Sequence, residues 1–246
     1  MCLNRSPKPR ADKIDITVLA FDVFGTVVDW RGGVIAELDR LADERGLSIN
    51  SGVVADAWRK GARVVLDRVA RGETPYTVLD DVHRSVLDGF AEEFSLTDLS
   101  ESDRQRLVST WHRLPAWPDA VEGLTRLRSQ YILTTLSNGG MAHQVDVARF
   151  AHLHFDCILS TELVKTYKPN PRVYELVPSL LRVRPEEAMM VASHPYDLAA
   201  AASQGFRTAF VRRPKEWGTG KSEEPNFPVD IAAHDFIDLA RKLDSQ

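Results

Sequence analysis

An apolar run that ends on an acid constrains the fold of this chain more than any other feature. The run covers residues 16–21, and Asp22 and Gly25 follow it. A short apolar run closed by a turn is typical of a strand buried on both faces of a sheet. In open α/β sheets, the carboxyl ends of the strands border the ligand crevice. We therefore expect the Asp22 carboxylate to lie at the reactive edge of a sheet.

Further apolar runs alternate with helix-period segments in the second half of the chain. Strands are expected at residues 131–136, 156–159, 188–192 and 208–211. Helices are expected near residues 120–129, 141–150, 171–181 and 196–204, the last one closed by Gly205. This alternation implies right-handed crossovers and a mostly parallel sheet covered on both faces. The predicted fold class is α/β, with a doubly wound, Rossmann-like sheet.

The region between Asp22 and this alternation contains no good strand. Apolar residues recur there at helical spacing in three stripes, which begin at Val34, Val54 and Val78. A helical cap, residues 31–113, is therefore expected to interrupt an α/β core made of residues 13–30 and 114–246. Residues 1–12 are polar and contain two prolines, so we expect a flexible tail without a signal peptide.

Composition narrows the classes of partner. The formal charge is -4, and long blocks of like charge are missing, so neither nucleic acid nor a membrane surface is an expected partner. No apolar segment approaches the roughly 18 to 20 residues that cross a bilayer. Cys2 and Cys157 lie far apart in the sequence, so a disulfide framework is not expected. We therefore expect the protein to be located in the reducing cytoplasm. A small molecule is the expected partner.

Polar side chains follow each of four predicted strands. Asp22 follows the first strand, Ser137 and Asn138 the second, Lys168 lies in the loop after the third, and Asp197 follows the fourth. Each residue alone could cap a turn or helix or remain a solvated surface charge. Because these loops share one edge of the predicted sheet, the set together indicates a catalytic site.

The same residues resemble the four motifs of the haloacid dehalogenase superfamily, in the same order along the chain. The motifs are residues 22–26, residues 136–138, residues 168–169 and Asp197. A helical insertion after the first motif resembles the cap of that superfamily. Its members share a nucleophilic aspartate but differ in chemistry, so the fold alone does not decide between them.

Two positions separate the branches of this superfamily. Its phosphatases carry a second aspartate two residues after the nucleophile and a metal-binding acid four residues before the last aspartate. This chain has Phe24 and Ser193 there. An aromatic residue and a serine are similar to the L-2-haloacid dehalogenases, which need no metal. The resemblance implies a cofactor-free hydrolase of short 2-haloacids, in which Asp22 attacks the carbon that bears the halogen and water cleaves the resulting ester.

The resemblance also implies roles for the surrounding residues. The catalytic set would comprise Asp22, Lys168, Asp197, Thr26 and Ser137. Substrate or halide contacts would come from Val23, Phe24, Arg59, Asn138, Tyr174, Ser193, His194 and Tyr196. Arg59 resembles the halide-binding arginine of the family, and Arg63 is the substitute candidate. The resembled enzymes are commonly dimers, so a homodimer is a further expectation.

The last motif departs from the resembled enzymes at two positions. Many L-2-haloacid dehalogenases have serine and asparagine where this chain has Ala192 and His194. An imidazole at residue 194 could position water or narrow the halide pocket, which would favour fluoride over bromide. Two alternatives stay open: a magnesium-dependent phosphatase or phosphonate hydrolase of the same superfamily, and a binding protein that has lost its chemistry.

Overall fold

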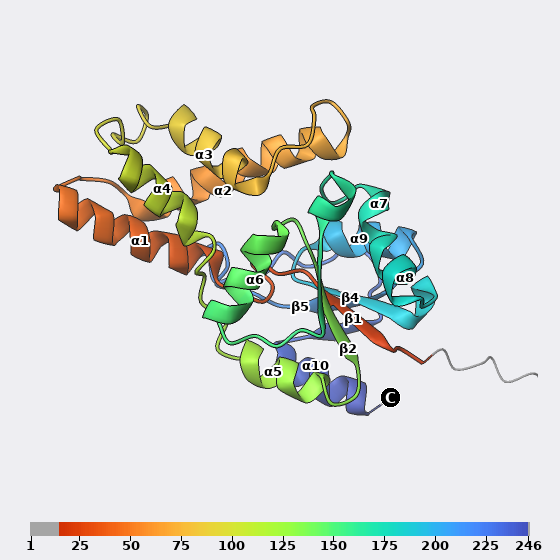
Figure 1. Ribbon diagram of the computed structural model, residues 1–246. Coiled ribbons are helices and arrows are strands. Elements are labelled where there is room, and N and C mark those ends of the chain that lie inside the picture. The colour runs from red at the N-terminus through yellow and green to blue at the C-terminus, as the bar shows by residue number, and fades with distance from the viewer. Residues whose placement is uncertain (1–14, 246) are drawn as a thin grey trace, which may run out of the picture.

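The apolar run before Asp22 forms β1 (Val18–Phe21), a central strand of a six-stranded parallel sheet (Figure 1). The computed structural model describes residues 15–245, so the predicted tail lies outside the described residues. The strand order is β3-β2-β1-β4-β5-β6. The other strands are β2 (Ile132–Ser137), β3 (Cys157–Ser160), β4 (Ala188–Ala192), β5 (Arg207–Val211) and β6 (Ile231–Ala233).

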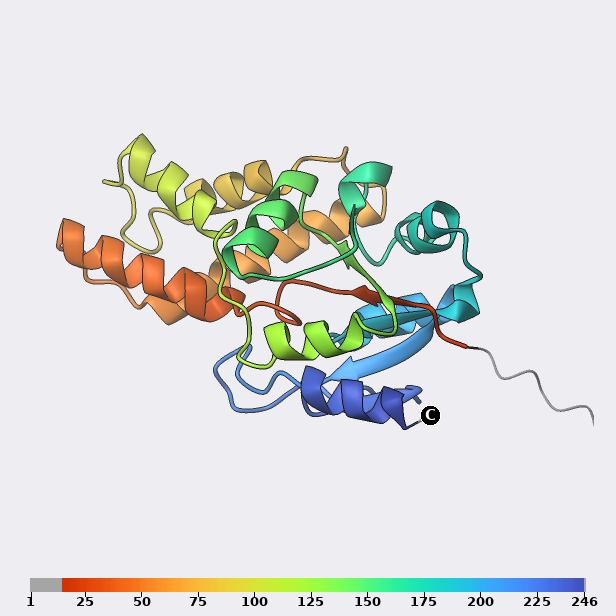
Figure 2. The same cartoon turned by 60° about the horizontal axis from the view of Figure 1, so that its bottom comes forward.

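Helices cover both faces of the sheet (Figures 1 and 2). On one face, α5 (Ala120–Leu127) and α10 (Phe236–Asp244) pack against Leu19 and Phe21 of β1. On the other, α7 (Pro171–Tyr174), α8 (Leu176–Leu181) and α9 (Pro195–Ser203) pack against Val18 and Ala20. Alternate residues of β1 thus enter two separate apolar clusters, as expected for a strand buried on both faces. The remaining core helix is α6 (Met141–Phe150).

Four helices lie between β1 and α5 and pack on one another above the carboxyl edge of the sheet (Figure 1). These cap helices are α1 (Trp30–Arg45), α2 (Ser51–Ala70), α3 (Leu79–Gly89) and α4 (Glu101–Thr110). Three tryptophans join these helices to one another: Trp30 stacks on Trp111 with ring centroids 5.9 Å apart, and Trp58 meets Trp111 edge to face at 5.6 Å. The division into a core and a cap domain at residues 30 and 114 stays a prediction.

The predicted fold class is confirmed, and most predicted elements are present within two residues at each end. The helix predicted at residues 171–181 is instead two short helices, α7 and α8, separated at Glu175. Gly205 follows α9 with φ of 87°, a conformation that glycine adopts readily. Strand β6 and helix α10 were not predicted. Two 3-10 turns, η1 (Thr161–Val164) and η2 (Pro185–Glu187), complete the described elements.

Candidate active site

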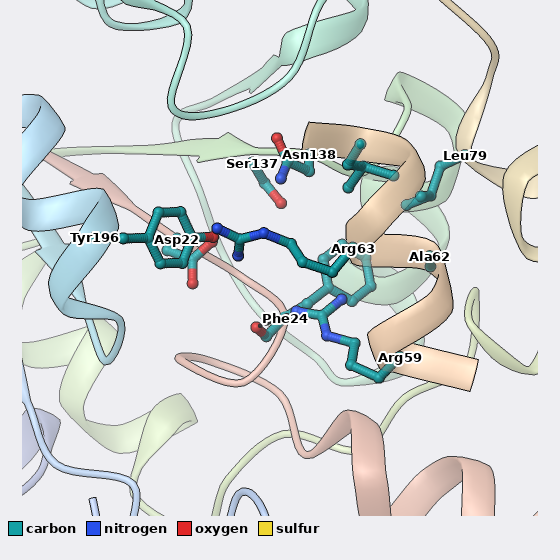
Figure 3. A pocket seen from close by; sticks show the side chains of 10 residues that line it. Asp22, Phe24, Arg59, Ala62, Arg63, Leu79, Ser137, Asn138 and Tyr196 are labelled. Carbon is teal, nitrogen blue, oxygen red and sulfur yellow. Dashed lines mark hydrogen bonds between the residues drawn. The ribbon is translucent and has the colours of Figure 1, made fainter. Parts of the chain in front are cut away.

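Four adjacent strands bring the predicted residues to one edge of the sheet. Phe21 pairs with Thr135 of β2 and with Val191 of β4, so the residues that end these three strands lie side by side. The chain runs from β1 to β2 on one side and reaches β4 on the other, which makes this edge a topological switch point. A small cavity of about 20 Å³ opens here between the sheet and helix α2 (Figure 3). It is lined by Asp22, Phe24, Arg59, Ala62, Arg63, Leu66, Leu79, Ser137, Asn138 and Tyr196.

The two oxygens of the Asp22 carboxylate have different surroundings. Oδ2 accepts hydrogen bonds from Thr26 Oγ1 at 2.7 Å and from His194 Nδ1 at 2.8 Å. Oδ1 lies 3.4 Å from Lys168 Nζ. Thr26 is fixed in turn by Ser193, whose backbone NH donates to Thr26 Oγ1 at 2.9 Å and whose hydroxyl lies 3.0 Å from it. Oδ2 is therefore the more strongly hydrogen-bonded oxygen, and Oδ1 the less encumbered one.

Asp22 is buried, yet its environment favours the charged form. Burial alone would raise the pKa of the carboxyl, but the Lys168 charge and the contacts with His194 and Thr26 outweigh it. The net effect holds the pKa of Asp22 far below its usual range. The carboxylate is therefore ionised at neutral pH and needs no base to become a nucleophile.

Lys168 connects Asp22 to a second acid below the cavity. Its side chain is fully buried, and Nζ donates to Asp197 Oδ2. Asp197 Oδ1 accepts from the Tyr174 hydroxyl at 2.7 Å. Burial and then the neighbouring Asp22 charge raise the pKa of Asp197, against the opposing effects of Lys168 and Tyr174. The group is a buried ion network in which each charge has a partner.

His194 forms a second bridge, between Asp22 and an acid that the sequence did not indicate. Its Nε2 lies 2.9 Å from Glu216 Oε1, which also accepts from Trp30 Nε1 at 3.1 Å. Burial disfavours the imidazolium, but Glu216 and Asp22 outweigh that effect and raise the pKa of His194 to about 10. At neutral pH His194 is therefore a cation, and both of its ring nitrogens donate.

Gly25 leaves room for this bridge. It has φ of 96°, and a Cβ at this position would lie 2.2 Å from Glu216 Oε1 and 3.1 Å from the His194 ring. A left-handed conformation already disfavours side chains here, and the close approach of Glu216 excludes one. The glycine of the first turn is thus required by the carboxylate that pairs with His194.

Both candidate arginines of helix α2 line the cavity (Figure 3). The Arg59 guanidinium donates to the Phe24 carbonyl at 3.3 Å and lies over the Trp30 ring, 5.4 Å from its centroid. Arg63 lies over the Tyr196 ring at 3.7 Å and donates to Asp67. Arg59 is enclosed by aromatic rings, which leave a weakly solvated cation facing the cavity.

The remaining predicted residues divide between the cavity wall and the layer beneath it. Ser137 and Asn138 line the cavity from the end of β2, and the backbone NH of Lys168 donates to Asn138 Oδ1 at 2.9 Å. Val23 is buried in the apolar core and does not line the cavity. Thr26, Lys168, Tyr174, Ser193, His194 and Asp197 also lie outside the lining and act on the site through their contacts with one another and with Asp22.

Three residues that contribute to the site were not predicted from the sequence: Glu216, Trp30 and Trp111. A signal for Glu216 was present, because it lies in the loop that follows β5, another strand that ends at this edge. The tryptophans carried no such signal, since their positions on the cap side fit ordinary core packing. Tertiary contacts alone place them against the Arg59 guanidinium.

The residues present suit nucleophilic chemistry better than metal chemistry at Asp22. The phenyl ring of Phe24 lines the cavity where a second carboxylate would stand, and the Ser193 hydroxyl is engaged with Thr26. The amino group of Lys168 lies between Asp22 and Asp197 and supplies the positive charge that these carboxylates need. Among the described residues, the one grouping of acids and histidines with metal-binding spacing lies elsewhere, at Asp80, His112 and His143.

Comparison with known proteins agrees with this arrangement. The model of the haloacid dehalogenase-like hydrolase family matches residues 16–205. The (S)-2-haloacid dehalogenase 4A of Burkholderia cepacia is 31% identical over 209 residues, which cover 78% of this chain and 81% of that protein. The (S)-2-haloacid dehalogenase 1 of Pseudomonas sp. (strain CBS-3) is 30% identical over 82% of this chain and 88% of that protein.

Solved structures of similar proteins extend the match to the cap helices. The L-2-haloacid dehalogenase PA0810 is 41% identical, with a TM-score of 0.89 over 94% of this chain and 100% of that one. The defluorinating L-2-haloacid dehalogenase Rha0230 is 35% identical, with a TM-score of 0.89 over 93% of this chain and 95% of that one. The family match, the extent of the relatives and the shared fold together show that this chain belongs to the haloacid dehalogenase-like hydrolases.

Proposed function

We propose that this protein hydrolyses short 2-haloacids to 2-hydroxy acids and halide, with Asp22 as the nucleophile and no metal. The ionised Asp22 carboxylate, which faces a small cavity walled by Arg59 and Arg63, is the observation that carries the proposal. The relatives named as 2-haloacid dehalogenases support it. The small size of the cavity, about 20 Å³, favours a short acid over a long one.

In the first step, Asp22 Oδ1 attacks the carbon that bears the halogen from the side opposite the halogen. The new C–O bond forms as the carbon–halogen bond breaks, and the halide leaves with the bonding electron pair. Oδ1 is the attacking atom because Thr26 and His194 already occupy Oδ2. The product is an ester of Asp22, with inversion where the carbon is chiral.

Arg59, Arg63, Ser137 and Asn138 hold the two negative groups of the reacting acid. Arg59 stabilises the leaving halide, since a cation enclosed by aromatic rings offsets charge that develops in the transition state. Ser137 and Asn138 donate hydrogen bonds to the substrate carboxylate. The side-chain oxygen of Asn138 already accepts a hydrogen bond from the backbone NH of Lys168, so the side-chain Nδ2 of Asn138 is the atom that donates. The Arg63 cation over Tyr196 balances the charge of the incoming acid.

In the second step, water attacks Cγ of the Asp22 ester, and negative charge develops on Oδ2. Thr26 and His194 donate hydrogen bonds to that oxygen at 2.7 and 2.8 Å, so these two donors form an oxyanion hole before the reaction begins. Asp197 accepts the proton of the water, because a raised pKa makes it a stronger base than an ordinary carboxylate. The Cγ–Oδ1 bond then breaks, and Oδ1 takes up the proton held by Asp197 and leaves as the hydroxyl of the hydroxy acid. The oxygen of water remains in Asp22, whose carboxyl returns to the ionised form by losing the second proton of the water to solvent.

A single assay tests the proposal against the phosphatase alternative. The purified protein is incubated with fluoroacetate, chloroacetate, bromoacetate and each enantiomer of 2-chloropropionate in excess chelator, and released halide is measured. We expect halide from the haloacetates and the L enantiomer. In parallel, phosphate esters are tested with and without magnesium. If phosphate is released only after magnesium is added and no acid yields halide, the proposal is overturned in favour of a phosphatase.

The fluoride preference is a finer proposal within the same site. It is supported by the small cavity and by the similarity to a defluorinating enzyme. Comparison of fluoroacetate and bromoacetate turnover in the wild-type protein and in His194→Asn tests it. Faster turnover of bromoacetate in both proteins would refute a role of His194 in halogen choice.

A further inference from the structure

A second cluster of ionisable side chains joins the cap helices to the core, away from Asp22. Asp80 lies in the first turn of α3, His112 follows α4, and His143 and Asp146 lie on α6. The ligand atoms of Asp80, His112 and His143 lie within 4.8 Å of one another. Two segments of the cap side and one core helix therefore present a carboxylate and two imidazoles to the same point.

The distances within this cluster are close to those between the ligand atoms of a metal ion. His143 Nδ1 lies 3.5 Å from Asp80 Oδ1, and His112 Nε2 lies 3.0 Å from the same oxygen. In a tetrahedral zinc site with bonds of about 2.0–2.2 Å, ligand atoms lie about 3.3–3.6 Å apart. Small side-chain movements would complete this geometry.

His143 carries the strongest indication of a ligand. Its side chain is 2% exposed, and neither ring nitrogen makes a hydrogen bond in the part of the chain that the structure describes. A buried polar group without a partner costs about 1–3 kcal/mol, so such groups call for an explanation such as a bound ion. The neutral imidazole that burial favours is also the form that binds a metal.

His112 has the outer support typical of a metal-binding histidine. Its Nδ1 lies 2.8 Å from Asp146 Oδ2, while Nε2 faces Asp80. A carboxylate that accepts from one ring nitrogen fixes the tautomer in which the other nitrogen can bind a metal. The His112 and His143 rings are stacked, with centroids 4.2 Å apart and planes 2° from parallel, so one ring has to turn about its side-chain bonds for both nitrogens to face the same ion.

We propose that Asp80, His112 and His143 bind a divalent cation of the zinc class, with water as the fourth ligand. Two imidazoles and one carboxylate favour zinc over magnesium or calcium, which prefer all-oxygen sites. Water can reach the ion because the Asp80 side chain is 46% exposed. The site is independent of the proposed dehalogenation and takes no part in its steps.

The bound ion would fix the cap helices against the core beside the active site. His143 packs edge to face on Phe24, with ring centroids 5.0 Å apart, and Phe24 lines the cavity. Cation binding would therefore stabilise the folded chain and hold the wall of the cavity in place. A ligand that binds only the folded state raises the melting temperature in proportion to the logarithm of its concentration.

Equilibrium dialysis and thermal unfolding test the site directly. The full chain is stripped with chelator and titrated with Zn²⁺, with Mg²⁺ in parallel. We expect about one Zn²⁺ per chain, no binding of Mg²⁺ at the same concentration, and a Tm rise of several degrees at 100-fold excess over Kd. Co²⁺ should give the visible absorption of a tetrahedral complex. A stoichiometry well below one would overturn the proposal.

Variants separate this site from adventitious binding elsewhere. Asp80→Asn and His143→Ala should each abolish the Zn²⁺-dependent Tm rise and the Co²⁺ absorption. His154→Ala, which removes an exposed histidine outside the cluster, should leave both unchanged. If His143→Ala does not fold, the Zn²⁺-dependent Tm rise and the Co²⁺ absorption of Asp80→Asn, which changes the more exposed ligand, decide whether the site exists. Binding that survives the Asp80 and His143 changes would place the ion elsewhere and refute the site.

Discussion

Replacement of His194 by alanine should slow the second step of the reaction selectively. His194 Nδ1 donates to Asp22 Oδ2, the oxygen that gains charge when water attacks the ester. Glu216 and Asp22 outweigh the burial of His194 and raise its pKa to about 10, so this donor is a cation at neutral pH. The first step forms its bond at Oδ1, which His194 does not contact, so it should continue at a similar or higher rate.

The size of the effect follows from the charge on the donor. A hydrogen bond from a charged group contributes about 1.5–3 kcal/mol, or about 10- to 150-fold in rate at ~1.4 kcal/mol per factor of ten. Loss of one donor to an oxyanion has a similar or larger effect, about 10²–10³-fold. We expect ester hydrolysis to slow about 100-fold, so that the Asp22 ester accumulates.

Rapid-quench measurement of halide and mass spectrometry of the protein follow the two steps. The variant should release a burst of halide close to one equivalent and carry one carboxymethyl group at Asp22 during turnover of a haloacetate. The double variant His194→Ala/Glu216→Gln removes the unpaired Glu216 charge and should retain the burst. A variant that slows the burst as much as the steady state, with no ester detected, would refute the oxyanion role.

Three further outcomes are expected from the same structure. Asp22→Asn should lower halide release by about 10⁴-fold or more, because it removes the nucleophile and leaves the fold intact. Halide release should fall as pH rises through about 10, since the raised pKa of His194 keeps its cation present below that pH; Glu216→Gln should move this fall to lower pH. Trp111→Ala should lower the free energy of unfolding by about 3–5 kcal/mol through loss of its stack on Trp30.

Each of these outcomes has a measurement that contradicts it. Halide assays with excess enzyme detect residual activity of Asp22→Asn, and activity within tenfold of the wild type would exclude Asp22 as nucleophile. A pH–rate profile with the same alkaline limb in Glu216→Gln would show that Glu216 does not hold the His194 cation. Urea unfolding of Trp111→Ala, with an unchanged midpoint, would contradict the packing argument.

The sheet and the cluster of polar residues at its edge were predictable because both depend on local patterns. Each apolar run forms a strand, and the strand order then brings Asp22 close to the segments after β3 and β4, which carry Lys168 and Asp197. Strand β6 has only three residues, too few for periodicity to show. Glu216 follows β5, a strand that ends at the same edge, but it lies in the long segment before β6, where its contacts with His194 and Trp30 decide its position.

The choice between Arg59 and Arg63 also depends on information that a sequence lacks. Both lie on one face of helix α2, one turn apart, and both reach the cavity. Only the packing of the cap helices decides that Arg59 is enclosed by Trp30 and Trp111, whereas Arg63 lies over Tyr196. Spacing along a helix indicates that both arginines are candidates for the halide-binding residue, but it does not show which of them binds the halide.

In the proposed mechanism, the buried charges allow the second step to proceed without a metal. Before the reaction, the carboxylates of Asp22, Asp197 and Glu216 face the cations of Lys168 and His194, so burial is offset by pairing. Ester formation removes the negative charge of Asp22 but leaves both cations where they were. The site then holds a local excess of positive charge around Oδ2 and the attacking water. Negative charge that develops on Oδ2 restores the lost pairing, so formation of the ester itself prepares the site for hydrolysis.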